Sequence, residues 1–389
     1  MDKKIIVHDF IEIPDIKFNN KSFGIVSNVK YPNAELIKTD NPISDSIICL
    51  RVSLNQTAIT LYNYISEQKI KYKIESIELY DKPIFVKSYS EYELNLITIL
   101  QMLKERNITN VSLHVDDYLE DVLKNIKKYK DLISFLDISI YGTCIKENPS
   151  ITSLLTYKIN NAMLAKNVFL LQSNNITLSI QANSICEKIN NITNTFGAVI
   201  WMIDFLFQIS LSNVQRIFVD MSDINNKYAY DIFKTVTRDS VSFLNFTTET
   251  NLMPNISIYC TRNLREQFII VIHKDEVLEE VMLEVALQNN NNATITILSN
   301  DETITGTQTI KTREETIKNE NSKYTVYVKK NTVVVINIPF MSGGAFFPTI
   351  NDEDEKNALV TLRPEANEYD SIPTTMTIDE FKKNYQPYM

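Results

Sequence analysis

The sequence has 389 residues, with 39 Lys and Arg against 48 Asp and Glu, so its formal net charge is −9. This acidic balance argues against nucleic acid as a partner, because such affinity comes from clustered basic side chains that neutralise phosphates. Apolar residues make up 44% of the chain, enough for a large core in two or three domains or in one barrel with an accessory domain.

The composition favours residues of A+T-rich codons, with 52 Ile, 41 Asn and 31 Lys against 8 Arg. We interpret this first as a genome signature, which points to an A+T-rich virus or protist. With only 6 Gly, no glycine-rich phosphate loop can be assembled. The Cys and His residues lie far apart without a CxxC pair, so we expect free thiols, no metal site and no cofactor. They are Cys49, Cys144, Cys186, Cys260, His8, His114 and His273.

The first ten residues, MDKKIIVHDF, lack the apolar run of a secretory signal. We therefore expect a chain that is not secreted and that lies in the cytoplasm or within a virus particle. The longest apolar stretch, Phe196–Leu211, is interrupted by Asp204 and Gln208. Its 16 residues are fewer than the roughly 20 that span a bilayer, so we expect a buried helix and no membrane span.

Short β-like runs fill the first 60 residues, and strand-like and helical stretches alternate from residue 58 to 215. That alternation favours a parallel sheet or a β/α barrel. The predicted strands are Ile5–Val7, Ile11–Ile13, Phe23–Val26, Ile47–Val52, Ile74–Leu79, Val111–Val115, Phe135–Tyr141, Val168–Leu171, Ile176–Gln181 and Val214–Val219. The predicted helices are Glu91–Lys104, Asp117–Tyr129, Ile151–Ala165 and Thr195–Ser210, the last with Asn194 or Thr195 as its N-cap.

After about residue 254, β-rich runs separated by Asn-rich turns predict an antiparallel sandwich. A 49-residue tail begins at Met341 and contains the acidic run Asp352–Glu355. Near its end, Thr377 to Glu380 has the spacing of a capping box, which predicts a short terminal helix. The sandwich runs are Ile256–Thr261, Phe268–His273, Val281–Gln288, Thr294–Leu298, Lys323–Val328 and Val333–Ile338.

We therefore predict an α/β chain with an all-β part: a shortened or incomplete TIM-like (β/α) barrel with a C-terminal antiparallel β-sandwich. Residues 1–20 are strands that join the sandwich, and residues 21–250 form the barrel. Residues 251–340 form the sandwich, and residues 341–389 form an acidic, proline-containing extension. We expect this extension to bind other protein subunits.

Several strings, in order along the chain, resemble the family 79 glycoside hydrolases (β-glucuronidases and heparanase relatives). The segment NTFGAVIWMIDFL (194–206) is similar to the family's DTFASALWALDYL helix, which follows the nucleophile strand. Four shorter strings look like the family's LRIGGNSAD, SIELGNEP, HxY and GETNS; they are LRVSLNQTA (50–58), SIELYDKP (76–83), SIY (139–141) and IQANS (180–184). The likeness covers about residues 20 to 339 and implies a sugar-cleaving barrel followed by a sandwich.

The resemblance places Lys82 at the family's acid/base glutamate and Gln181 at its nucleophile glutamate. A retaining glycosidase needs two carboxyl groups about 5–5.5 Å apart. An amide forms no displaceable glycosyl ester, and an ammonium group beside an oxocarbenium cation raises the barrier. We therefore expect a pseudoenzyme without catalytic residues. Neighbours of this former site are Arg51, Asn55, Glu78, Asp81, Ser139, Tyr141 and Asn183.

Other departures from the family concern the space around the former site. Ser53 and Leu54 replace its paired glycines, which fills room that a sugar occupies, and Ser139 replaces its HxY histidine. Only 22 residues separate Asn55 from Glu78, where the family's stretch is several times longer. One or more β/α units must therefore be shortened or missing.

Three functions stay open. The first is a non-catalytic structural or protein-interaction subunit, for which a large DNA virus particle is one setting. The second is a carbohydrate-binding protein that kept the cleft, with weak glycan binding. The third is an active glycosidase with relocated acids at Asp116, Asp117 or Asp137.

Simpler roles compete with each of these functional ones. Trp201 and Phe205 fit the core better than a sugar-stacking platform. Asp204 fits a contact between its helix and a neighbouring loop better than a functional acid. Asp116 and Asp117 fit an N-cap of the next helix better than a relocated acid pair.

Overall fold

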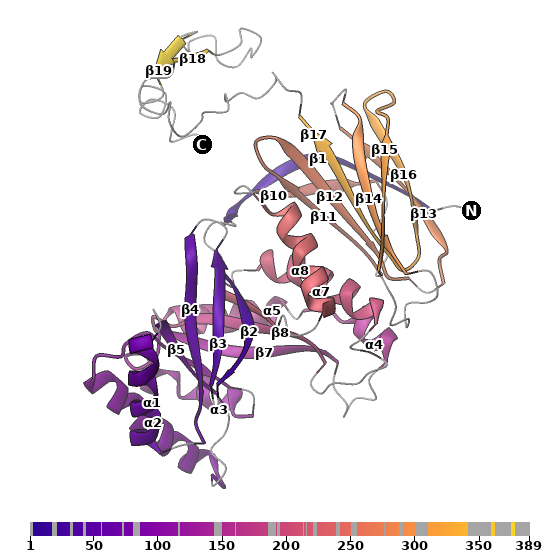
Figure 1. Ribbon diagram of the computed structural model, residues 1–389. Helices are drawn as coiled ribbons and strands as arrows, with labels where there is room; N and C mark the ends of the chain where they lie inside the picture. Colours follow the sequence, from indigo (N-terminus) through magenta and orange to yellow (C-terminus); the bar gives the residue numbers. More distant parts are fainter. Residues whose placement is uncertain are drawn as a thin grey trace.

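The computed structural model consists of a barrel wrapped by helices and a large curled sheet beside it (Figure 1). Along residues 12–49 it describes the backbone alone. The described residues are 3–17, 22–31, 34–41, 44–55, 57–71, 74–80, 86–115, 117–143, 150–159, 161–185, 192, 195–212, 214, 216–220, 224–238, 242–249, 255–275, 277–287, 291–300, 310–340, 359–361 and 375–377.

Eight strands close the barrel in the order β2-β3-β4-β5-β6-β7-β8-β9. The six from β4 to β9 run parallel to one another, and β2 runs parallel to β9. β3 is antiparallel to both of its neighbours. The strands are β2 (Ser22–Tyr31), β3 (Ala34–Asn41), β4 (Ser44–Ser53), β5 (Ile74–Tyr80), β6 (Val111–His114), β7 (Phe135–Thr143), β8 (Thr177–Ile185) and β9 (Arg216–Asp220).

Helices follow the parallel strands and lie outside the barrel. Side chains cap several of them: the Ser88 hydroxyl accepts a hydrogen bond from the Glu91 amide, and Ser150 and Ser153 form a reciprocal capping box. Thr195 caps α7, as one of the two residues predicted for that role. The helices are α1 (Ala58–Lys71), α2 (Tyr89–Glu105), α3 (Leu119–Lys124), the 3-10 turn η2 (Ile126–Lys128), α4 (Ile151–Thr156), α5 (Asn161–Gln172), α7 (Phe196–Ser210) and α8 (Ile224–Val236).

The start of the barrel departs from strict strand-and-helix alternation. β2, β3 and β4 pair as consecutive antiparallel strands, with only residues 32–33 and 42–43 between them. Two hairpins thus stand where a (β/α)8 barrel has helical crossovers. β3 escaped prediction because its sequence, AELIKTDN, shows no apolar alternation. It supplies an additional strand, which lets a barrel with a shortened β/α sequence close.

Several predictions of elements were wrong in detail. The predicted strand Val168–Leu171 lies inside helix α5, because a short apolar run cannot be told from a buried helical segment by periodicity. The predicted helix Ile151–Ala165 is two helices, α4 and α5, interrupted after Thr156. The predicted helix Asp117–Tyr129 is the shorter α3 followed by a 3-10 turn, and α1, α8 and β10 (Ser242–Thr248) were not predicted. The alternation of strands and helices between β5 and β9 was nevertheless predicted in outline.

The second body is one nine-stranded mixed sheet, in the order β15-β14-β17-β12-β11-β10-β1-β13-β16. It is antiparallel except between β1 and β13, and it curls until β16 lies against β12 and β17, so that it nearly closes. This corrects the predicted sandwich of purely antiparallel sheets, because the N-terminal strand inserts parallel to β13. The strands are β1 (Lys3–Lys17), β10 (Ser242–Thr248), β11 (Ile256–Arg262), β12 (Glu266–His273), β13 (Glu280–Ala286), β14 (Ala293–Ser299), β15 (Lys311–Ile317), β16 (Lys323–Lys329) and β17 (Thr332–Pro339).

Helix α7 joins the two bodies. Nearly every residue of this 15-residue helix is buried, because it packs against barrel strand β8 and helices α4 and α8, and against the outer face of the sheet through residues such as Tyr259. Among the helices of the described chain, none is long and apolar enough to cross a membrane. In the tail, β18 (Leu359–Thr361) pairs with β19 (Thr375–Thr377). The predicted terminal helix lies outside the described residues, except for Thr377, which ends β19.

Candidate functional site

Where side chains are described, from the end of β4 to β9, the strands of the barrel carry apolar side chains outward and mostly polar side chains inward. Outward residues such as Leu79, Leu113 and Ile180 belong to the core shared with the helices. Because side chains alternate along a strand, their neighbours face the interior. A TIM barrel normally fills this space with Val, Ile and Leu. Here it is filled by Arg51, Ser53, Ser76, Glu78, Ser112, His114, Phe135, Asp137, Ser139, Ser179, Gln181, Arg216 and Phe218.

Glu78 stands at the centre of a network that links five strands. Arg51 donates to Glu78 Oε1 from Nε at 2.9 Å, and its Nη2 lies 2.8 Å from the same oxygen. That Nη2 also donates to Gln181 Oε1 at 2.7 Å, across the barrel. On the other side, His114 Nδ1 lies 3.3 Å from Glu78 Oε1, and His114 Nε2 lies 3.0 Å from Ser139 Oγ. The network therefore runs from Gln181 through Arg51, Glu78 and His114 to Ser139.

The charge state of Glu78 follows from these contacts. Burial by itself raises the pKa of this fully enclosed carboxyl. The charge of Arg51, the hydrogen bond and charge of His114 and the charge of Arg216 outweigh burial and lower the pKa to about 2. Glu78 is thus an ionised acceptor at neutral pH and holds no proton for a leaving group.

A second layer lies deeper in the barrel. Arg216 donates to the Ser76 hydroxyl at 3.3 Å and lies over the rings of Phe135 and Phe218, at 4.3 Å and 4.6 Å. The contacts with Ser76 and Phe135 join β9 to β5 and β7, and the contact with Phe218 lies within β9. Among the contacts of this guanidinium are thus a hydroxyl group and two aromatic rings.

Asp137 completes this deeper layer. Burial and the negative charge of Glu78 raise its pKa, and Arg216 opposes that shift. The hydroxyls of Ser112 and Ser179 oppose it as well, although within the described residues neither makes a hydrogen bond of good geometry to the Asp137 carboxyl. With exposed fractions of 1% for Asp137 and 0% for Glu78, neither carboxyl of this pair can reach a sugar from solvent.

The sequence-predicted site residues divide into three groups. Arg51, Glu78, Ser139 and Gln181 meet in the network. Asn55 is exposed, and its backbone N–H donates a hydrogen bond to Ser53 Oγ. Tyr141 is half-buried in β7, and Asp117 is exposed before α3. Asp81, Lys82 and Asp116 lie outside the described residues, as does the side chain of Asn183.

Sequence reasoning missed the roles of His114 and Arg216. His114 seemed isolated because its partners are 36 residues upstream and 25 residues downstream. The signal that could have revealed it is the polar alternation within apolar strands: Ser76 and Glu78 in β5, Ser112 and His114 in β6, Asp137 and Ser139 in β7. Such a pattern places polar side chains on one side of each strand.

Outside the barrel, the candidate residues have structural roles. Trp201 and Phe205 are buried in the core, with ring centroids 5.1 Å apart. Asp204 lies in a buried contact between α7 and the sheet: Lys274 Nζ is 2.5 Å from its Oδ2, and Tyr259 Oη is 2.7 Å from its Oδ1. Within the described chain, no group of three His, Cys, Asp or Glu is placed to hold a metal ion.

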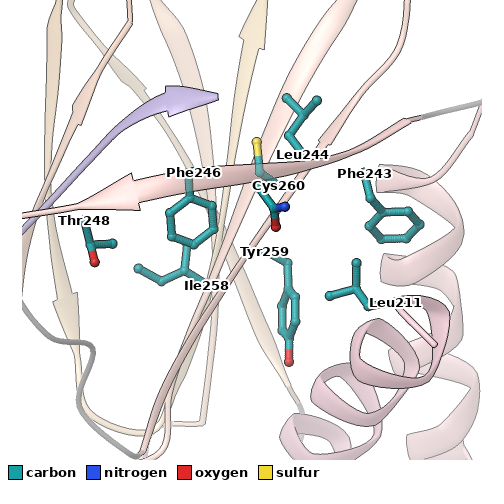
Figure 2. A pocket seen from close by; sticks show the side chains of 9 residues that line it. Leu211, Phe243, Leu244, Phe246, Thr248, Ile258, Tyr259 and Cys260 are labelled. Carbon is teal, nitrogen blue, oxygen red and sulfur yellow. The ribbon is translucent and has the colours of Figure 1, made fainter. Parts of the chain in front are cut away.

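A pocket of about 280 Å³ opens where β10 and β11 diverge after two residue pairs (Figure 2). Its lining is mostly apolar, and it includes Phe243, Phe246, Ile258 and Tyr259. It lies on the sheet, away from the polar network. It is therefore a separate feature from the barrel site.

The sequence matches no known protein family and no curated protein. Solved structures do match the fold. An α-L-arabinofuranosidase from Thermotoga maritima matches with a TM-score of 0.54 and 10% identity, over 71% of this chain and 70% of that chain. A 4-O-α-L-rhamnosyl-β-D-glucuronidase from Fusarium oxysporum 12S matches with a TM-score of 0.54 and 9% identity, over 82% and 86%. A glucosidase from Croceicoccus marinus matches with a TM-score of 0.53 and 10% identity, over 88% and 99%.

The chain has a glycoside-hydrolase-like fold. Identities near 10% show the architecture alone, a TIM-type barrel with an additional β-sheet domain. Activity has to be argued from the side chains inside the barrel.

Proposed function

We propose that this protein is a glycosidase-like scaffold that no longer cleaves glycosidic bonds and serves as a structural or protein-interaction subunit. The observation that carries the proposal is the state of Gln181. The resemblance to family 79 assigns the nucleophile to this position. Here the position holds a neutral amide, whose oxygen accepts a hydrogen bond from Arg51 at 2.7 Å. An amide held in this way does not attack an anomeric carbon.

Among the described side chains inside the barrel, the two acids Glu78 and Asp137 do not replace that pair of carboxylates. Glu78 is ionised and bound by Arg51, and its carboxyl is fully enclosed. Asp137 is enclosed as well. A retaining mechanism needs two carboxyl groups that touch the same sugar. The enclosure of Glu78 and Asp137 therefore supports a scaffold without glycosidase chemistry.

A panel of aryl glycosides, including arabinofuranosides, glucuronides and glucosides, tests this proposal. We expect no release of the aryl group above buffer from the purified full chain. Sustained release that disappears in both Glu78→Gln and Asp137→Asn would contradict the proposal and support relocated acids. Release that survives both substitutions points to a contaminating enzyme. The assay is then repeated on protein that is purified again through a second affinity tag, until release either vanishes or depends on these residues.

The subunit role needs its own test. We expect native mass spectrometry of the assembly purified from its source to show this chain at a fixed integer ratio to its partners. Recovery as a free chain only would overturn this part of the proposal. A glycan array separates the remaining alternative, because saturable binding to a defined sugar would favour a carbohydrate-binding protein.

A further inference from the structure

Three residues from neighbouring strands of the barrel stand in the order nucleophile, base and acid. Ser139 Oγ of β7 lies 3.0 Å from His114 Nε2 of β6, and His114 Nδ1 lies 3.3 Å from Glu78 Oε1 of β5. Serine hydrolases on unrelated folds share this sequence of contacts. We propose that Ser139, His114 and Glu78 form an acyl-transfer site that hydrolyses carboxylic esters with small acyl groups.

The contacts fix the chemistry of the imidazole. His114 Nδ1 lies 3.3 Å from the ionised carboxylate of Glu78 without a hydrogen bond of good geometry, and this nearby negative charge favours the tautomer that carries its proton on Nδ1. The Nε2 atom then holds a lone pair that accepts the Ser139 hydroxyl proton. Two hydrogen-bonding contacts from Arg51 hold Glu78 in place, which makes Glu78 a positioning residue for the base.

Gln181 supplies the donor that such a site needs. It pairs with Ser139 across β7 and β8. Because a guanidinium only donates, the Gln181 oxygen must face Arg51, which leaves the amide NH2 as a donor at the same end of the barrel. Amide side chains act in this way on the oxyanion of acyl-transfer intermediates.

The position of the cluster also fits a reaction site. Ser139, His114, Tyr141 and Gln181 are partly exposed towards the carboxyl ends of their strands, where barrel enzymes carry their sites, whereas Asp137 below them is enclosed. Ser139 is only partly exposed, so we expect a short acyl group to reach its hydroxyl more readily than a long one. This selects small esters over long-chain ones.

The reaction balances with water as the co-reactant. Ser139 Oγ bonds to the ester carbonyl carbon while its proton passes to His114 Nε2, and the carbonyl oxygen becomes the oxyanion. The carbon–oxygen bond to the alcohol then breaks, and the alcohol leaves with the proton from His114. Water next attacks the acyl-serine and gives a proton to His114, and that proton returns to Ser139 as the carboxylic acid is released.

A fluorophosphonate probe on the folded full chain tests the assignment, with p-nitrophenyl acetate hydrolysis as the second measurement. We expect one adduct, which peptide mapping places on Ser139. We expect it to be absent from Ser139→Ala and at least tenfold slower in His114→Gln. The matched control Ser134→Ala, five residues earlier on the same segment, keeps the wild-type rate. No adduct at Ser139, or ester hydrolysis unchanged in Ser139→Ala, overturns the proposal.

The role of Glu78 has a separate readout. We expect Glu78→Gln to lower the labelling rate per folded molecule at least tenfold, and Glu78→Asp to restore part of it. A purely structural Glu78 would lower the folded fraction and leave that rate unchanged, which would overturn its assignment. The inference goes beyond the proposed function, because acyl transfer needs no pair of glycosidase carboxylates, so each proposal can fail while the other stands.

Discussion

The barrel and the curled sheet fill their interiors with opposite kinds of side chain. Inside the sheet lie apolar residues such as Val271, Leu283 and Ile336. Inside the barrel lie charged groups, among them Glu78 and Arg216. The barrel owes its apolar burial to the outer surface of its strands, under the helices, whereas the sheet buries apolar groups on its inner surface and against α7.

The two interiors differ in how they contribute to stability. Apolar burial stabilises by roughly 25 cal/mol per Å² and makes no demand on partners. A buried ion pair is only weak evidence of stability, because desolvation offsets its attraction, yet removing one partner leaves a costly unpaired charge. In the interior of the barrel, each buried charge therefore depends on its partner. In the interior of the sheet, each apolar side chain contributes separately through packing.

Removing Glu78 should produce the largest effect. In Glu78→Leu the guanidinium of Arg51 stays buried without its carboxylate. We expect the free energy of unfolding to fall by about 4 kcal/mol, the range for breaking a buried pair. Denaturation in urea, followed by circular dichroism, measures this change.

The double variant Arg51→Met/Glu78→Leu is the control for mutual dependence. Replacing both charges with apolar groups removes the unpaired guanidinium, so we expect a smaller loss than in Glu78→Leu alone. If the double variant loses as much stability as Arg51→Met and Glu78→Leu lose in sum, Arg51 and Glu78 are not coupled. The contrast between the barrel and the sheet then fails.

The sheet should respond by volume instead. Leu283 is fully buried in the sheet core, and Leu283→Ala leaves a cavity that we expect to cost about 3 kcal/mol. In the same core, Ile336→Val removes one methyl group and should cost about 1 kcal/mol. Urea denaturation measures both. If Leu283→Ala lost less stability than Ile336→Val, the inner face of the sheet would not be closely packed.

Acid should distinguish the two interiors. The pKa of Glu78 is about 2 in the folded protein, below its unfolded value, so its contribution is present above the unfolded pKa. That contribution is lost as the pH falls from about 5 to about 2, and the difference is worth up to about 3 kcal/mol. The raised pKa of Asp137 acts in the opposite sense, because its contribution is present at low pH and lost as the pH rises through the folded pKa.

Stability curves between pH 6 and pH 3 test this assignment. Arg51→Met/Glu78→Leu should flatten the acid dependence. Leu283→Ala should shift the whole curve and keep its slope, because it removes no titratable group. An unchanged slope in the double variant would assign the acid sensitivity to other carboxyls.

Much of the fold could be predicted from local pattern. Strands β5 to β9 and helices α2 and α7 carry apolar periods that packing does not override. β3 and β15 were missed because AELIKTDN and KTREETI show no strand pattern; pairing with their neighbours makes them strands. The parallel insertion of β1 beside β13 joins residues almost 280 positions apart, and no local signal carries such a pairing.

The site could be predicted only in part. The strings around Arg51, Glu78, Ser139 and Gln181 each lie on a strand of the parallel part of the barrel. What they contact could not be predicted. The partners of Glu78 depend on strand register and on the direction in which each side chain points across the barrel, and both are set by closure.

A smaller effect than that of Leu283→Ala is expected at the junction of the two bodies. Tyr259 of β11 donates to Asp204 at 2.7 Å and stacks on Phe207 of α7, with centroids 4.7 Å apart. Tyr259→Phe keeps the stacked ring and removes only the hydroxyl, while Lys274 continues to neutralise Asp204. We expect a loss of about 1.5 kcal/mol, the lower value for a hydrogen bond to a charged group. The exposed Tyr327→Phe should lose almost nothing in the same urea experiment, and equal losses would mean that ring packing alone joins the barrel to the sheet.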